Sequence, residues 1–442
     1  MYLKTPKRYT AKGSRRPLLN LRWLWLYLLF PVILIPLILA WDYRDQLAPW
    51  IGDKVKQVNL SLPQAATPTA TALPSNIGEQ LGTDFSTGKI NLALDLLQSV
   101  AQVSPNDPTV YNLIAQHLIF RSYSTNAAML KEAVAAGQRA INAAPEIPDG
   151  WVSEALALDW SGKPQEALGY VLRATELNDK DPMAMVVMAE IYSDLQKDDQ
   201  ANKMVDDAID AAKAAKPLNR AALAHAYYVK AQLLLSSDGK EATRQLEEAW
   251  RAATSDPPDP TIPAGYIAQL LASNYSTLDQ TDLATTLLGQ AIKRDQDDPI
   301  LDYAMAKVYY KVGARNKART YAVACQDRAP DEPRCLRMVA QLFFLEQNYT
   351  QAAQSIEKVI AQGSQLADDY YLAGLSYSYL QQCDTAVADL KAGLPFIKAD
   401  DAKTRANYED ALRACNASSG LPITPTVTET PAPTAAATPK KR

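Results

Sequence analysis

Residues able to carry catalysis or bind metal are few and scattered in this 442-residue chain. His117 and His225 are the only histidines, and neither lies near a second ligand type at the spacing of a metal site. Adjacent acids such as Asp206 and Asp207 are expected on helix surfaces. The sequence contains no glycine-rich phosphate loop, nucleophile elbow or Cys-x-x-Cys pair. We therefore expect no enzyme, no cofactor and no metal site, with both histidines in packing or surface roles.

The chain instead repeats a helical pattern every 34 residues between Gly265 and about Asp400. Small residues recur at this interval, each three residues before an aromatic one. The small residues are Ala272, Ala306, Ala340 and Gly374, and the aromatic ones are Tyr275, Tyr309, Phe343 and Tyr377. A small residue lets one helix approach its neighbour closely, and the aromatic ring fills the space beside it. One such helix pair cannot bury its own apolar face, so the period predicts a solenoid of stacked helical hairpins.

This pattern resembles the tetratricopeptide repeat (TPR) family. The unit from Pro299 carries the matching residues Ala306, Tyr309, Gly313, Ala318, Cys325 and Pro330. The unit from Pro148 carries Trp151, Ala155, Gly162, Ala167 and Ala174. The resemblance implies an all-α fold, a right-handed superhelical solenoid of about nine TPR-like helical hairpins over residues 74–400. It also implies a capping helix over residues 401–417.

Two stretches depart from the 34-residue register. In the unit from Pro108 the second helix arrives six residues late, which predicts an enlarged turn near Ser122 to Met129. Segment 255–263 contains four prolines, which no helix would carry. It is either a kinked joint between two repeat blocks or a surface loop, and we favour the joint.

The amino-terminal residues predict a membrane anchor. Residues 1–22 hold seven Lys or Arg and no acid, and residues 23–41 hold no charge. Nineteen helical residues span roughly 28 Å, about the thickness of a bilayer core. We expect a transmembrane helix with the amino terminus in the cytoplasm and the repeats outside. A cleaved signal peptide is the alternative, although bulky Ile38 lies two places before the best cleavage position, Ala40.

Three further segments flank these regions. Residues 42–60 are expected to be juxtamembrane, and residues 61–75 and 418–442 are rich in Thr and Pro. Such compositions predict an extended linker and a disordered tail. Thr-Pro spacers of this kind resemble those of bacterial envelope proteins. Sugar on the Thr residues is an open alternative to a bare linker.

All four cysteines lie in the last third of the chain. Cys325 ends one second helix and Cys335 begins the next first helix, so a short turn joins them. Cys383 lies in the turn of the last repeat, where the capping segment with Cys415 can fold back on it. In an oxidising exterior this predicts two bonds, Cys325 to Cys335 and Cys383 to Cys415. The alternative is that Cys325, at a small-residue position, is a buried apolar filler.

The resemblance also implies a concave groove lined by the exposed side of each first helix. In the later units the corresponding residues are Tyr303, Lys307, Tyr310, Lys311, Arg334, Arg337, Gln341, Phe344, Tyr371 and Tyr379. Basic and aromatic groups together can clamp an acidic or carboxyl-terminal peptide. The earlier units present an acidic floor, made of Asp149, Asp159, Trp160, Glu190 and Asp194. The alternative is that these residues form ordinary solvated faces.

We therefore expect a membrane-anchored, extracytoplasmic TPR scaffold that binds a protein or peptide in its groove. A formal net charge of -4 gives no reason to expect nucleic acid as a partner. One alternative is a structural surface component that self-associates. Another is an accessory subunit of an envelope secretion or glycan-assembly complex.

Overall fold

The structure is a computed structural model that describes residues 76–256 and 258–417, all within one compact unit, Thr71–Arg442. Within these residues the regular elements are nineteen α-helices and one short 3-10 helix, η2 (Leu394–Phe396). The predicted anchor, its flanking segments, the Thr/Pro linker and the tail lie outside the described residues. Among the helices that the structure does describe, none is both long and apolar enough to cross a bilayer.

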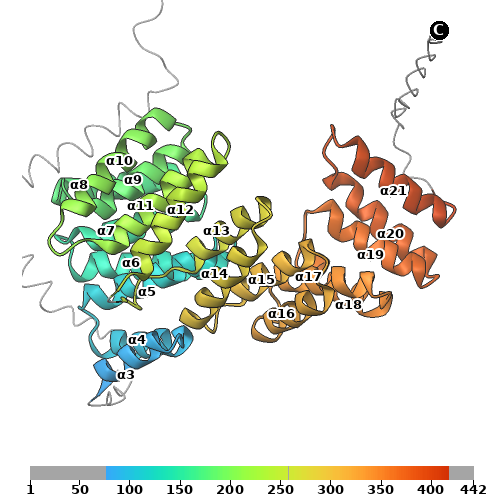
Figure 1. Cartoon of the computed structure of the whole chain (residues 1–442), viewed down its shortest axis with the longest axis horizontal. Coiled ribbons are helices and arrows are strands. Elements are labelled where there is room, and N and C mark those ends of the chain that lie inside the picture. The colour runs from blue at the N-terminus through green and yellow to red at the C-terminus, as the bar shows by residue number, and fades with distance from the viewer. Residues whose placement is uncertain (1–75, 257, 418–442) are drawn as a thin grey trace, which may run out of the picture. The chain divides into compact units, whose positions relative to one another are not determined.

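The helices form nine consecutive pairs, each of which packs against the next (Figure 1). The pairs are α3 (Ile77–Ser86) with α4 (Ile90–Val103), α5 (Pro108–Ser122) with α6 (Ala127–Ala143), α7 (Pro148–Trp160) with α8 (Pro164–Leu177), α9 (Pro182–Asp194) with α10 (Asp198–Ala214), α11 (Arg220–Leu234) with α12 (Gly239–Thr254), α13 (Gly265–Thr277) with α14 (Thr281–Arg294), α15 (Pro299–Lys311) with α16 (Arg315–Arg328), α17 (Pro333–Leu345) with α18 (Tyr349–Ala361), and α19 (Ala367–Tyr379) with α20 (Cys383–Gly393). A single helix, α21 (Ala402–Ala414), follows them. The prediction of an all-α, hairpin-by-hairpin solenoid is confirmed.

The turn inside each regular pair reverses the chain at one residue with left-handed backbone. These residues are 34 apart within each run and have φ between 58° and 76°: Gly162 and Gln196, then Asp279, Gly313, Gln347 and Gln381. After each of them the next amide bonds a carbonyl five residues back, as from Lys163 N to Leu158 O (3.0 Å). This arrangement satisfies carbonyls that the end of the first helix leaves without partners. The repeat period is therefore set by the backbone of the turn as well as by side-chain packing.

The small residues of the pattern lie where the two helices of a pair touch. Ala272, Ala306 and Ala340 are at most 1% exposed. The recurring alanines of the second helices, Ala284, Ala318 and Ala352, are equally buried. In the last pair Gly374 takes this position opposite Leu390. A Cβ on Gly374 would lie 2.5 Å from Leu390 Cγ, which is too close for an alanine. The glycine therefore lets Leu390 approach α19 more closely than an alanine would allow.

The six extra residues of the second pair lengthen its helices more than its turn, so the expectation of an enlarged turn is largely wrong. Helices α5 and α6 have 15 and 17 residues, against 13 and 14 in α7 and α8. The connection grows only from three residues to four. Helix formation satisfies backbone groups that a longer loop would leave open, so the added residues extend helices. The extension carries Arg121, Ser122 and Tyr123 beyond the end of a regular first helix.

The described residues of segment 255–264 pack between helices that are distant in the sequence. Ile262 and Ala264 are buried. Arg220 bonds Ser255 O at the start of the segment (2.6 Å), and Arg294 bonds Asp259 O in its middle (3.1 Å). Beyond the segment, α13 contacts α5 as well as α12. The chain therefore returns to its second helix pair at this point.

Helix α21 covers the last pair. Tyr408 is fully buried, and its hydroxyl donates a hydrogen bond to Ala367 O at the start of α19 (2.5 Å).

One disulfide joins Cys383, the first residue of α20, to Cys415, directly after α21. The other joins Cys325 to Cys335 between α16 and α17. Both predicted pairings are confirmed, with Cα atoms 5.5 Å apart in the first and 5.3 Å apart in the second.

Candidate functional site

The predicted groove residues all lie on α15, α17 and α19, the first helices of the last three pairs. Lys307 is exposed, Gln341 and Tyr303 are half-buried, and Tyr371 lies against the capping helix with its ring 5.5 Å from that of Tyr408. The structure therefore spreads the ten residues over several environments, and the peptide clamp they were expected to form remains a prediction.

Three of the four basic groove residues pair with groups of the chain itself. Arg337 forms two hydrogen bonds to Asp369, of 2.5 and 2.7 Å, and so joins α17 to α19. Arg334 bonds Glu332 (2.7 Å), and its guanidinium lies 5.6 Å from the centre of the Tyr123 ring. The third, Lys311, contacts Ser276 O and Asp279 at the end of α13. Arg337 and Lys311 thus join neighbouring pairs, and Arg334 reaches back to the second pair through Tyr123, roles that their sequence positions did not indicate.

Three aromatic residues, from the end of α17, the start of α18 and the end of α19, form a cluster in which one ring is exposed. We call Phe344, Tyr349 and Tyr379 the aromatic cluster. The rings of Tyr349 and Tyr379 stack with centroids 4.5 Å apart, and the Phe344 ring lies 5.4 and 5.7 Å from them. Tyr379 nevertheless is 60% exposed. Tyr349 was missed in the sequence because it begins a second helix, outside the positions that line a TPR groove.

Two residues of the predicted acidic floor, Trp160 and Glu190, belong to a buried polar network, whereas Asp149 and Asp194 are exposed. Glu190 accepts a hydrogen bond from Trp160 Nε1 (3.0 Å) and lies 2.9 Å from His225 Nε2. On its other side, His225 Nδ1 lies 3.3 Å from the hydroxyl of Tyr266. The imidazole of His225 thus bridges Glu190 and Tyr266 through its two ring nitrogens. Stacking between Phe120 and Tyr266, 4.3 Å apart, closes the network on the side of α5.

An open pocket of about 330 Å³ lies against this network, where α7 and α9 end and α11 passes. We call it the acidic pocket, because three of its ten lining residues are Asp159, Glu190 and Asp194, and none is basic. Asp194 is exposed, whereas Asp159 is only 2% exposed, and neither of its carboxyl oxygens has a hydrogen-bond partner. Burial, with Glu190 and Asp194 nearby, raises the pKa of Asp159 to about 9.

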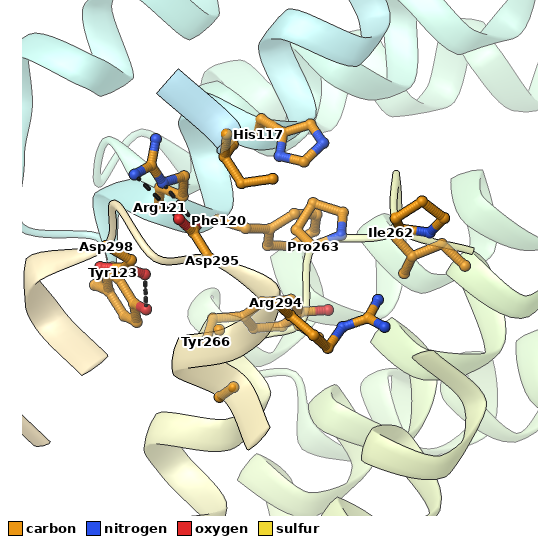
Figure 2. Close-up of a pocket in the computed structure, with 15 residues that line it drawn as sticks. His117, Phe120, Arg121, Tyr123, Ile262, Pro263, Tyr266, Arg294, Asp295 and Asp298 are labelled. Carbon is orange, nitrogen blue, oxygen red and sulfur yellow. Dashed lines mark hydrogen bonds and ion pairs between the residues drawn. The ribbon is translucent and has the colours of Figure 1, made fainter. Parts of the chain in front are cut away.

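The second candidate region is the contact between α5 and the turn that joins α14 to α15 (Figure 2). We call this contact the joint; it is a different feature from the kinked joint predicted at residues 255–263. Arg121 pairs with Asp295 (3.0 Å), and the hydroxyl of Tyr123 donates to Asp298 (2.5 Å). Burial raises the pKa of Asp295 to about 7, although Arg121 opposes the shift. The cavity left among these side chains is only about 30 Å³, which is the size of a site for ordered water.

Both histidines are core residues, in agreement with a packing role. His117 is 2% exposed and His225 1%. Burial first, and then the neighbouring Arg121, lower the pKa of His117 to about 3, so it is neutral at physiological pH. Across residues 76–256 and 258–417, no group of three or more His, Cys, Asp or Glu side chains could hold a metal ion.

Comparisons with known proteins agree with this fold. No protein-family model matches the chain, and no curated protein matches it by sequence. Among solved structures, it is similar to a chain of the APC/C hetero-tetramer Cut9-Hcn1, with a TM-score of 0.54 and 13% identity. The match covers 74% of this chain and 59% of that one, so this chain spans less than two thirds of its neighbour. The fold is a TPR-like solenoid.

Two smaller proteins also match parts of the TPR-like solenoid. One is YrrB, described as a TPR protein with an unusual peptide-binding site; it has 20% identity and a TM-score of 0.33, with 46% of this chain and 95% of that chain covered. The other is PilW, described as a widely conserved type IV pilus biogenesis factor; it has 16% identity and a TM-score of 0.36, with 57% and 95% covered.

Replacing Asp159 by Asn should stabilise the solenoid, and more so at higher pH. The unfolded carboxyl loses its proton near its ordinary pKa of 3.8, whereas the folded one keeps it to about pH 9. Folding therefore becomes less favourable as pH rises between these values. We expect Asp159→Asn to add about 1–3 kcal/mol at pH 7, with a smaller gain at pH 5.

Urea unfolding followed by circular dichroism at pH 5 and pH 8 measures this gain. Asp179→Asn, at an exposed acid between α8 and α9, is the matched control and should change little at either pH. An equal gain at both pH values would show that the folded carboxyl is ionised, which contradicts the prediction.

Proposed function

We propose that this chain is a protein-binding scaffold, held at the cytoplasmic membrane by residues 23–41 and displaying its repeats outside the cytoplasm. The TPR-like solenoid supports the scaffold role, because stacked helix pairs build extended surfaces without a catalytic centre. One structural neighbour is a chain of the hetero-tetramer Cut9-Hcn1, and YrrB is described as a TPR protein with an unusual peptide-binding site. We extend protein binding to this chain on that basis.

The observation that carries the proposal is the aromatic cluster on the last two helix pairs. Tyr379 is 60% exposed, Phe344 and Tyr349 are half-buried, and stacking between Tyr349 and Tyr379 already orders the cluster. Ordered rings lose little entropy when a partner covers them, and aromatic residues dominate the binding energy of many protein interfaces. The exposed Lys307 on α15 leaves one basic group of the predicted groove open to an acidic partner.

The placement outside the cytoplasm rests on different features. The basic flank before residue 23 and the charge-free segment after it support an anchor with its amino terminus inside. Two disulfides that use all four cysteines support an oxidising compartment.

Photo-crosslinking in native membranes tests the scaffold role. The full chain is made with a benzoylphenylalanine in place of Tyr379, and a matched version carries the same group at Val323, an exposed apolar position on the second helix α16. We expect one protein adduct from position 379 and none from position 323. The adduct should disappear when Phe344 and Tyr349 are both replaced by Ser. Identical adducts from both positions would refute the docking surface, and adducts between two copies would favour the self-associating alternative.

The same membranes test the placement. Protease added to intact spheroplasts should digest the repeats, and alkylation before reduction should label none of the four cysteines. Protected repeats with four free thiols would contradict an extracytoplasmic location while leaving the crosslinking result valid.

A further inference from the structure

The acidic pocket combines three carboxyl groups with two helix ends. Asp159 is the penultimate residue of α7, and Asp194 is the last residue of α9. Carbonyl groups at the end of a helix carry partial negative charge, so acids are unfavourable there. Glu190, one turn before Asp194, adds a third carboxyl. The pocket is therefore strongly electronegative, and no side chain that lines it is basic.

Asp159 is not satisfied by the chain in either protonation state. The neutral acid has no acceptor for its proton, and the carboxylate has no donor for its oxygens. A buried polar group without partners destabilises the fold by about 1–3 kcal/mol. By contrast, Glu190 has two partners, Trp160 and His225. An unpaired acid in the wall of an open pocket is thus an exception that points to a missing partner.

The size and walls of the pocket favour an organic cation. Its volume of about 330 Å³ lies near the lower end of small-molecule sites. Trp160 and Tyr228 line it, and aromatic rings attract ammonium groups.

We propose that the acidic pocket binds a primary ammonium group, presented either by a lysine side chain of a partner polypeptide or by a free small diamine. The ammonium group meets Asp194 at the mouth and Glu190 in the wall. Its positive charge favours ionisation of the buried Asp159, which releases the proton that this carboxyl otherwise retains. The site lies on α7, α9 and α11, away from the aromatic cluster, so its test does not depend on the result at that cluster.

The binding should depend on pH. Glu190 and Asp194 face Asp159 from α9, while Tyr228 and His225 lie beyond them on α11, with Tyr266 of α13 behind His225. The pKa of Asp159 is raised to about 9 by burial and then by Glu190 and Asp194, so below this pH a bound cation must displace a proton. Affinity for ammonium should therefore rise at least tenfold between pH 6 and pH 8.5.

Titration calorimetry of the full chain in detergent tests this proposal. The probes are N-acetyl-lysine amide, putrescine, the neutral isostere N-acetyl-norleucine amide, and magnesium chloride. We expect the amines to bind at least tenfold more tightly than the neutral isostere. We also expect proton release at pH 8, which is detected as a difference in binding heat between two buffers. Tighter binding of putrescine would identify a free diamine as the source, and tighter binding of the lysine derivative would identify a partner's side chain.

Two variants and a control complete the test. Asp159→Asn and Asp194→Asn should each weaken amine binding at least tenfold, while Asp179→Asn should leave it unchanged. Folding of Asp159→Asn is not in question, because that change is expected to stabilise the chain. Equal binding of the neutral isostere, competition by magnesium, or full affinity in Asp159→Asn would overturn the proposal.

Discussion

Replacing Arg337 by Met is expected to destabilise the last helix pairs by about 3–5 kcal/mol. Asp369, its partner on α19, is 1% exposed and would remain as a buried carboxylate without its cation. The hydroxyl of Ser364 would be its remaining side-chain donor (2.6 Å). Because each pair of a solenoid is stabilised mainly by its neighbours, the loss should concentrate in α19 to α21.

Hydrogen exchange measured by mass spectrometry gives the local effect of Arg337→Met. Exchange should rise in peptides from residues 364–415 and stay unchanged before residue 254. Arg319→Met is the matched control, since Arg319 pairs with Glu346 on the surface and such pairs contribute about 0–1 kcal/mol. A second change, Asp369→Leu, should recover part of the lost stability by removing the buried charge. Unchanged exchange in Arg337→Met would mean that the ion pair is not needed for packing.

Replacing Arg121 by Ala is expected to have an effect of similar size at the joint, again about 3–5 kcal/mol. The change removes the cation that opposes the rise in the pKa of Asp295 and the hydrogen bond from Arg121 to Asn91 (2.7 Å). Without this cation the pKa of Asp295 would rise further, and its buried carboxyl would no longer attract α5. The contact between α5 and the turn that joins α14 to α15 should loosen.

Hydrogen exchange again identifies the affected residues. Peptides that cover residues 88–91, 255–264 and 295–298 should exchange faster in Arg121→Ala, while residues 364–415 should not change. Arg173→Ala, at an exposed pair with Glu176, is the control and should cost less than about 1 kcal/mol. Faster exchange throughout the chain would show that the joint is required for global folding and has no local role.

These two arginines illustrate why sequence reasoning located helices better than sites. Arg337 lies at a position that lines the groove in the TPR family, and its basic charge indicated ligand binding. Its partner Asp369 is 32 residues away, in the next repeat, and its burial decides that Arg337 is structural. The only sequence signal near Arg121 was the six-residue break in the 34-residue repeat of the unit from Pro108. Its partner Asp295 is 174 residues away, beyond what a repeat pattern can relate.

The sequence by itself determined the repeating part of this protein. The 34-residue period predicted the helix pairs, and the order of the cysteines on those pairs predicted both disulfides. Such features depend on neighbouring pairs, where the backbone geometry of one repeat fixes the position of the next.

Only the tertiary structure decided which polar residues are satisfied and which are not. It brought α5 against α13 to α15, paired Arg121 with Asp295, and enclosed Glu190 with Trp160 and His225. It also left Asp159 buried beside an open pocket without a partner. Burial and pairing depend on side chains from several repeats meeting at one point, and a periodic sequence pattern does not contain that information.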